Sequence, residues 1–122
     1  FVVHGHDGLD EITTTTTSSV AVVRGPKVEL LELDPRDYGL PLAQPADLAG
    51  GDPAFNAQII REILAGQQGP KRDITLLNAA AAIVAGGKAN DLKEGLAVAA
   101  LSIDSGAAKA KLEQLVSATR LS

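Results

Sequence analysis

Short apolar runs bounded by glycine and proline fill the first 40 residues, a pattern typical of strands. Residues 20–23 and 28–33 flank the turn signal Arg24-Gly25-Pro26-Lys27, so they predict a β-hairpin. Residues 1–3 predict a buried strand whose end opens into a polar loop. The Thr-rich stretch 13–19 favours a strand through its β-branched side chains, but its hydroxyls suit an exposed loop equally well.

Apolar residues recur at helical spacing through residues 46–122. Asp52 is predicted to cap the first long helix, Pro53 to occupy its first turn and Gly66 to end it. Residues 72–85 predict a second helix that is apolar almost all round and is therefore buried on several sides, with Asn78 bonding locally. The inward stripe of the first helix comprises Phe55, Ile59, Ile60, Ile63 and Leu64.

Two more helices are predicted after Gly86-Gly87. Asp91 and Glu94 form a D-x-x-E pair that resembles a capping box, and Ser105 is expected to cap the last helix. Strands in residues 1–40 followed by a helical half in residues 46–122 indicate an α/β fold. The inward stripes are Leu92, Leu96, Ala99, Ala100 and Ile103 in one helix, and Ala108, Leu112, Leu115 and Val116 in the other.

Composition narrows the class of protein. The chain has 122 residues, enough for one domain with a hydrophobic core, and its net charge of -4 argues against nucleic-acid or membrane-surface partners. It has no cysteine, which excludes disulfides and thiolate metal sites and fits a cytoplasmic protein. No apolar run reaches the roughly 20 residues that span a membrane. Because the chain lacks an initial methionine and starts inside a strand-like run, we expect it to be a piece of a longer protein.

Residues 4–11 hold both histidines, three carboxylates and two glycines, and they support three interpretations. In the first, Asp10 and Glu11 bind Mg²⁺ and serve a phosphorylated ligand. Adjacent side chains on a strand point to opposite faces, so these two must then sit in a turn. In the second, His4 and His6 share one strand face and bind a transition metal, which needs three or four ligands.

The third interpretation of residues 4–11 is structural: His4 is buried and bonded to backbone, and Asp7-Gly8 forms a turn. Two other segments leave a functional alternative open beside a structural one. The hydroxyls of residues 13–19 could touch a phosphate. The structural alternative is that this stretch is a solvated strand or loop. Gly50-Gly51 could cradle a phosphate, although the lysine and third glycine of a phosphate loop are missing. The structural alternative is that the two glycines only precede a helix start.

Residues 4–11, H-G-H-D-G-L-D-E, resemble the H-G-x-x-G-x-D-E signature of the anthranilate phosphoribosyltransferase family. Further segments match motifs of that family in the same order along the chain, so the resemblance covers essentially all of it. These segments are residues 33–40, Gly50-Gly51-Asp52 with Asn56-Ala57, residues 69–73 with 77–80, residues 92–95 and residues 103–107.

The resemblance implies an enzyme that transfers the phosphoribosyl group of phosphoribosyl pyrophosphate to anthranilate, releasing pyrophosphate, in tryptophan biosynthesis. It implies the large α/β domain of the nucleoside phosphorylase/phosphoribosyltransferase fold. In the family the Asp-Glu pair holds a magnesium ion that binds the pyrophosphate, and this role falls on Asp10 and Glu11. The cofactor expected is therefore Mg²⁺. No catalytic role is carried over to His4 or His6, and no substrate-binding residue is assigned.

Several parts of the family pattern are absent from this sequence: the G-T-G-G-D loop, the N-x-S segment, the K-H-G-N stretch and the anthranilate arginine. The resemblance therefore implies that residues 1–122 are a single partial domain, roughly the carboxyl-terminal third of the enzyme. The N-terminal helical domain, through which the family forms homodimers, is missing. We expect this chain alone to be inactive.

Three rival interpretations remain. A pyrimidine-nucleoside phosphorylase shares the fold but has a different signature around its glycines and acidic residues. A non-enzymatic, nucleic-acid-binding relative on the same scaffold predicts a basic face, which the net charge of -4 opposes. A structural fragment would bind no metal at all.

Overall fold

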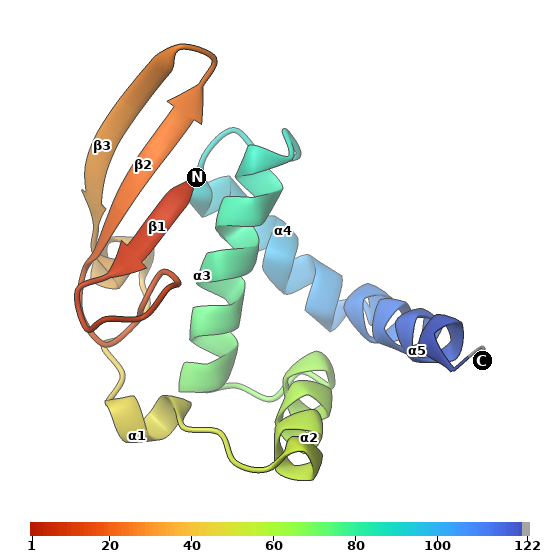
Figure 1. Cartoon of the computed structure of the whole chain (residues 1–122). Coiled ribbons are helices and arrows are strands. Elements are labelled where there is room, and N and C mark those ends of the chain that lie inside the picture. Colours follow the sequence, from red (N-terminus) through yellow and green to blue (C-terminus); the bar gives the residue numbers. More distant parts are fainter. Residues whose placement is uncertain (121–122) are drawn as a thin grey trace.

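The computed structural model describes residues 1–120, and Figure 1 shows a small sheet followed by a layer of helices. This order confirms the predicted α/β fold with its strands first. The strands are β1 (Val2–Gly5), β2 (Ser18–Arg24) and β3 (Lys27–Leu33), followed by the 3-10 helix η1 (Pro35–Tyr38). The helices are α1 (Pro45–Leu48), α2 (Pro53–Leu64), α3 (Pro70–Ala85), α4 (Leu92–Asp104) and α5 (Ala107–Thr119).

The sheet is antiparallel with the order β1-β2-β3. The predicted hairpin is confirmed, because Arg24 pairs with Lys27 and only Gly25 and Pro26 lie between the strands. Gly25 has a φ of 58°, a backbone conformation that glycine adopts without steric cost. Alternate residues of β2 then point inward to the core.

The prediction that residues 1–3 form a buried strand is wrong in its burial. β1 forms as expected, but Val2 is 66% exposed and Val3 is half-buried. β1 lies at the edge of the sheet, and only one face of the sheet meets the helices (Figure 1). Val2 is on the other face, opposite Ala21 of β2, with which it pairs.

The core has two parts, and α3 belongs to both. The larger part joins the inner face of the sheet to Leu77, Ala80 and Ala81 of α3. The smaller part joins Leu76 of α3 to α4 and to the end of α2. The prediction that this apolar helix is buried on several sides is therefore confirmed, and α3 connects the sheet to the other helices.

α3 and α4 approach each other unusually closely at Gly95. A Cβ atom added there would lie 2.8 Å from the carbonyl oxygen of Ala80 and 3.1 Å from its Cα. Contacts under about 3.0 Å between a Cβ and backbone are not accommodated without a shift of the chain. The backbone of α4 therefore packs directly on the backbone of α3.

The predicted helix starts are confirmed at two places. The Asp52 carboxylate accepts a hydrogen bond from the Phe55 amide at 2.8 Å, and Asp91 accepts one from the Glu94 amide at 2.8 Å. The Glu94 carboxylate differs from a standard capping box, because it reaches back to the amide of Asn90 instead of Asp91. Each cap satisfies an amide that has no partner within its helix.

Four predictions about the outer helices are wrong. Phe55 and Ile60 of α2 are 51% and 48% exposed and Leu115 of α5 is 59% exposed, so these three stripe positions do not face a core. Gly106, not Ser105, is the N-cap of α5. α2 and α5 lie at the margin of the helical layer, and α5 points away from the sheet (Figure 1). Within residues 1–120, no helix has both the length and the apolar character needed to cross a membrane.

Candidate functional site

The polar loop between β1 and β2 turns sharply as soon as β1 ends. The Gly5 amide donates to the Leu9 carbonyl at 2.9 Å, and the Gly8 amide donates to the Gly5 carbonyl at 2.9 Å. Gly8 has a φ of 96°, in the left-handed region that favours glycine. The interpretation of Asp7-Gly8 as a turn is confirmed, and the turn brings the loop back toward the strand end.

Asp7 organises this loop. Its carboxylate accepts hydrogen bonds from the hydroxyls of Thr13 at 2.6 Å and Thr15 at 2.5 Å, and from the Leu9 amide at 3.2 Å. Burial acts to raise the pKa of Asp7, but these hydrogen bonds stabilise the carboxylate and together lower the pKa below its usual range. The loop is therefore tied across its width by an ionised side chain.

Within the Thr-rich stretch 13–19, the strand expectation holds only for Ser18 and Ser19, and the expectation of a solvated loop is wrong for Thr13 and Thr14. β2 begins only at Ser18, and Thr13 and Thr14 are fully buried. Their burial follows from the bonds to Asp7 and from the Ala43 amide, which donates to the Thr14 carbonyl at 2.9 Å. The stretch packs inward as the inner wall of the loop.

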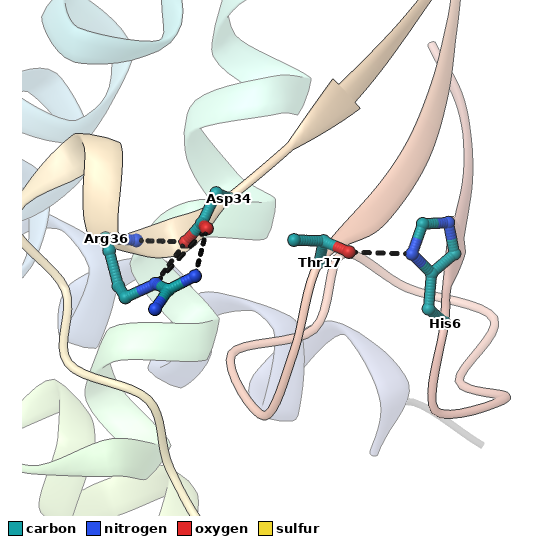
Figure 2. Close-up of polar contacts among 4 residues, drawn as sticks. All are labelled: His6, Thr17, Asp34 and Arg36. Atoms are coloured by element: carbon teal, nitrogen blue, oxygen red, sulfur yellow. Dashed lines mark hydrogen bonds and ion pairs between the residues drawn. The ribbon is translucent and has the colours of Figure 1, made fainter.

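Within residues 1–120, neither histidine belongs to a cluster of side chains that could bind a metal ion. His6 contacts the hydroxyls of Thr17 through Nδ1 at 2.7 Å and of Ser19 through Nε2 at 2.8 Å, and Figure 2 shows the first of these contacts. His4 is exposed, so the expectation that it is buried is wrong. In the described part of the chain, residues 1–120, no three His, Cys, Asp or Glu side chains come together as a metal site would require.

Asp10 and Glu11 lie in consecutive bends of the loop after β1 and not on a strand, which is compatible with a shared site. Both are exposed, and within residues 1–120 neither carboxylate has an ion-pair or hydrogen-bond partner. Two adjacent carboxylates without a neutralising cation suit Mg²⁺, which binds oxygen ligands and keeps several waters. Two protein ligands of an octahedral ion are compatible with further ligands from substrate phosphates, so the residues present fit half of such a site. Magnesium binding by this pair remains a prediction.

The residue after the pair is fixed from a distant helix. The Ile12 amide donates to Asn78 Oδ1 at 2.9 Å, and Asn78 Nδ2 donates to the Ile12 carbonyl at 2.8 Å. The expected local bond of Asn78 also exists, to the Ile74 carbonyl at 3.0 Å. Sequence reasoning missed the contact with Ile12. The available signal was that Asn78 is the one polar residue in the interior of an otherwise apolar helix segment.

The Gly50-Gly51 segment precedes helix α2, and the Asn56 side chain of that helix hydrogen-bonds to its backbone. Asn56 Oδ1 accepts from the Gly51 amide at 2.8 Å, and Asn56 Nδ2 donates to the Gly51 carbonyl at 3.0 Å. A Cβ at Gly50 would lie 2.6 Å from Asn56 Oδ1, so a larger residue there would force the Asn56 side chain to shift. The structure favours the plain helix start, because the Gly51 amide that would meet a phosphate is already bonded.

Polar groups after β3 form local hydrogen bonds in the connector between the sheet and the helices. Asp34 accepts from the Arg36 amide at 2.9 Å and from Arg36 Nη2 at 2.6 Å (Figure 2). These bonds from Arg36 lower the pKa of Asp34. Tyr38 is half-buried against the core, as predicted, and its burial raises its pKa. These residues have a structural role in ending β3.

Comparison with known proteins places the chain in a family. The sequence pattern of the glycosyl transferase family, a/b domain, matches residues 1–109. Anthranilate phosphoribosyltransferase of Parvibaculum lavamentivorans is 55% identical over 119 residues, which are 98% of this chain and 35% of that protein. The enzyme of the same name from Solibacter usitatus is 55% identical over 115 residues, 94% of this chain and 34% of that protein.

Solved structures agree with these sequence matches. Anthranilate phosphoribosyltransferase from Thermus thermophilus superposes with a TM-score of 0.84 at 37% identity, over 94% of this chain and 34% of that chain. The Saccharomyces cerevisiae enzyme in complex with phosphoribosyl pyrophosphate and Mg gives 0.79 at 32% identity, over 91% of this chain and 32% of that chain. The chain spans about a third of the length of these relatives. It therefore belongs to the glycosyl transferase family, in the a/b domain, and its near relatives there are anthranilate phosphoribosyltransferases.

Proposed function

We propose that this chain is the carboxyl-terminal third of an enzyme that transfers the phosphoribosyl group of phosphoribosyl pyrophosphate to anthranilate, releasing pyrophosphate, in tryptophan biosynthesis. The observation that carries the proposal is the exposed Asp10-Glu11 pair, which lies in a bend of the loop after β1. The chain that holds the pair is 55% identical to an anthranilate phosphoribosyltransferase. The Saccharomyces cerevisiae relative binds phosphoribosyl pyrophosphate and Mg, which supports the same ligands here.

In this proposal Asp10 and Glu11 supply two carboxylate ligands to Mg²⁺. When bound, the ion neutralises the charge that develops on the departing pyrophosphate. The chain contributes a loop that holds the two carboxylates at fixed positions, since Leu9 is bonded to Gly5 on one side and Ile12 to Asn78 on the other. The phosphoribosyl-binding and anthranilate-binding segments lie outside this chain, as the missing family motifs imply.

Neutral variants of the pair test this role in the full-length enzyme. Asp10→Asn and Glu11→Gln keep the side-chain size but remove the charge that binds the metal, and each is expected to lower kcat/KM about 100-fold, or roughly 2.7 kcal/mol. Steady-state rates at varied Mg²⁺ concentration measure the effect, which we expect to be smaller at saturating Mg²⁺. Glu29→Gln, at an exposed carboxylate of β3, is the matched control and should leave the rate unchanged. Wild-type rate and Mg²⁺ dependence in both loop variants would refute the metal role.

The isolated chain is expected to be inactive because it holds only one ligand pair of the site. The 122-residue chain incubated with phosphoribosyl pyrophosphate, anthranilate and Mg²⁺ should form no phosphoribosylanthranilate by fluorescence assay. The full-length enzyme under the same conditions is the positive control. Product formed by the short chain would show that the rest of the protein is not needed for the reaction.

The whole enzyme is further proposed to be a cytoplasmic homodimer that pairs through its N-terminal domain, as the family resemblance implies. The relatives described above are all anthranilate phosphoribosyltransferases, so this function ranks ahead of a pyrimidine-nucleoside phosphorylase or a nucleic-acid-binding relative. Size determination of the full-length enzyme in solution, with and without its N-terminal domain, tests the dimer.

A further inference from the structure

We propose that Asn78 is a positioning residue for the metal-binding pair: its carboxamide fixes the backbone of Ile12 and thereby the direction in which Asp10 and Glu11 point. The inference rests on the proposed function of that pair. Asn78 lies on α3 and the pair lies in the loop after β1, so the contact joins segments that are 66 residues apart.

The Asn78 carboxamide makes two of its three hydrogen bonds to the backbone of Ile12. Oδ1 accepts from the Ile12 amide at 2.9 Å, and Nδ2 donates to the Ile12 carbonyl at 2.8 Å. The other hydrogen of Nδ2 goes to the Ile74 carbonyl at 3.0 Å, which holds the side chain in a single orientation on its own helix. Asn78 is thus locked on α3 and presents one donor and one acceptor to the loop.

The bond to the Ile12 amide acts on the peptide unit between Glu11 and Ile12. Fixing that peptide plane restricts the backbone torsion of Glu11 that precedes it. The Ile12 side chain is also fully buried in the core between the sheet and α3. Ile12 is therefore anchored by its side chain and by both of its backbone polar groups.

The other side of the pair is anchored as well. The Leu9 carbonyl accepts from the Gly5 amide at 2.9 Å, and the Leu9 amide donates to Asp7 at 3.2 Å. Only Asp10 and Glu11 lie between these two anchors, and both are exposed. Loss of Asn78 leaves Ile12 held by its buried side chain alone, so the peptide unit next to Glu11 is free to turn and the directions of the two carboxylates are less restricted.

Asn78→Leu removes both bonds to Ile12 at similar side-chain volume. In the full-length enzyme we expect the Mg²⁺ concentration for half-maximal rate to rise about tenfold, because residues that orient metal ligands typically contribute about 10–100-fold to metal affinity. The value of kcat at saturating Mg²⁺ should stay within about threefold of wild type, since the carboxylates themselves remain. Asn78→Ser, which also loses the reach to Ile12 but adds no apolar group, should shift the Mg²⁺ dependence in the same direction.

A second readout does not depend on activity. Amide hydrogen exchange of the metal-free enzyme should show faster exchange at Ile12 in Asn78→Leu, with unchanged exchange at Leu77 in the middle of α3. Leu76→Ala serves as a destabilised control, because Leu76 lies in the smaller part of the core, with α4 and the end of α2. Thr75→Val is a mild control, because the Thr75 hydroxyl donates to the Lys71 carbonyl of its own helix.

The outcomes separate the two proposals. If Asp10→Asn and Glu11→Gln change the Mg²⁺ dependence but both Asn78 variants leave it at wild type, the positioning role is refuted and the metal site stands. If Leu76→Ala shifts the Mg²⁺ dependence as much as Asn78→Leu does, the effect is general destabilisation and the positioning role is also refuted. If the Asp10 and Glu11 variants behave as wild type, the metal site itself is refuted.

Discussion

Replacing Gly95 by alanine is expected to destabilise the protein by about 3 kcal/mol, the upper part of the range for forcing extra atoms into a packed core. Elsewhere in a helix this substitution usually stabilises by roughly 0.5–1 kcal/mol, because alanine is the better helix former. The sign reverses here because the new Cβ would lie 2.8 Å from the Ala80 carbonyl oxygen, a backbone atom that cannot rotate away. α3 and α4 must separate, and the core on both sides of α3 loosens with them.

Urea unfolding of wild type and variant measures this loss as a shift of the midpoint. Ala97→Gln, at an exposed position two residues further along α4, adds more atoms than Gly95→Ala and should leave the midpoint nearly unchanged. Ala80→Gly in the Gly95→Ala background should recover part of the loss, because the Ala80 Cβ is the third close neighbour at 3.1 Å. A neutral or stabilising Gly95→Ala would mean that the two helices are not packed backbone to backbone.

The parts of the fold that the sequence predicts are those decided by near neighbours in the chain. The hairpin follows from the turn signal at Gly25-Pro26 between two apolar runs, and the helix starts at Asp52 and Asp91 follow from side chains that bond amides three residues away. These signals need no knowledge of the rest of the molecule, because turn and cap chemistry act within one turn of the backbone. The bounds of β3 and α3 therefore agree closely with expectation.

Apart from the N-cap of α5, which is one residue from its expected place, the errors concern which side chains are buried, and burial depends on contacts outside the local pattern. An apolar run such as residues 1–3 predicts burial, yet burial depends on what covers each face of the strand, and Val2 is on the uncovered face. Thr13 and Thr14 look solvated by composition, but Asp7 and the core draw them inward. Residue type alone carries no information about such partners.

In the candidate site, too, the local geometry could be predicted from the sequence and the contact with a distant segment could not. The adjacency of Asp10 and Glu11 requires a turn if they share an ion, and that geometric argument holds without a structure. The anchor supplied by Asn78 could not be predicted, since a polar residue on an apolar helix can bond to any segment that packs there. The glycine pair at residues 50–51 shows the opposite case, in which a motif that suggests phosphate binding serves to make room for Asn56.

Removing the partner of a buried charge is the second substitution with a large expected effect. The Arg72 side chain is nearly inaccessible, and its Nη2 donates to both Asp104 carboxylate oxygens at 2.9 and 3.1 Å. Within residues 1–120, Arg72 Nη1 has no hydrogen-bond partner, and Asp104 is the carboxylate that forms the ion pair with the guanidinium, while Asp73 interacts with it only electrostatically. Asp104→Ala is therefore expected to cost about 3 kcal/mol, the lower end for a broken buried pair, because half of the Asp104 side chain is exposed.

The double variant Arg72→Met with Asp104→Ala should be more stable than Asp104→Ala alone. Most of the cost of the single variant is the uncompensated guanidinium in a low-dielectric environment, and methionine removes that charge while filling similar space. Urea unfolding of the single and double variants measures the difference. Arg36→Gln removes the cation of the exposed Asp34–Arg36 pair and should have no measurable effect, since water screens that pair. If the double variant is instead less stable than Asp104→Ala, Arg72 contributes through packing or a further partner, and the pair with Asp104 is not its main stabilising contact.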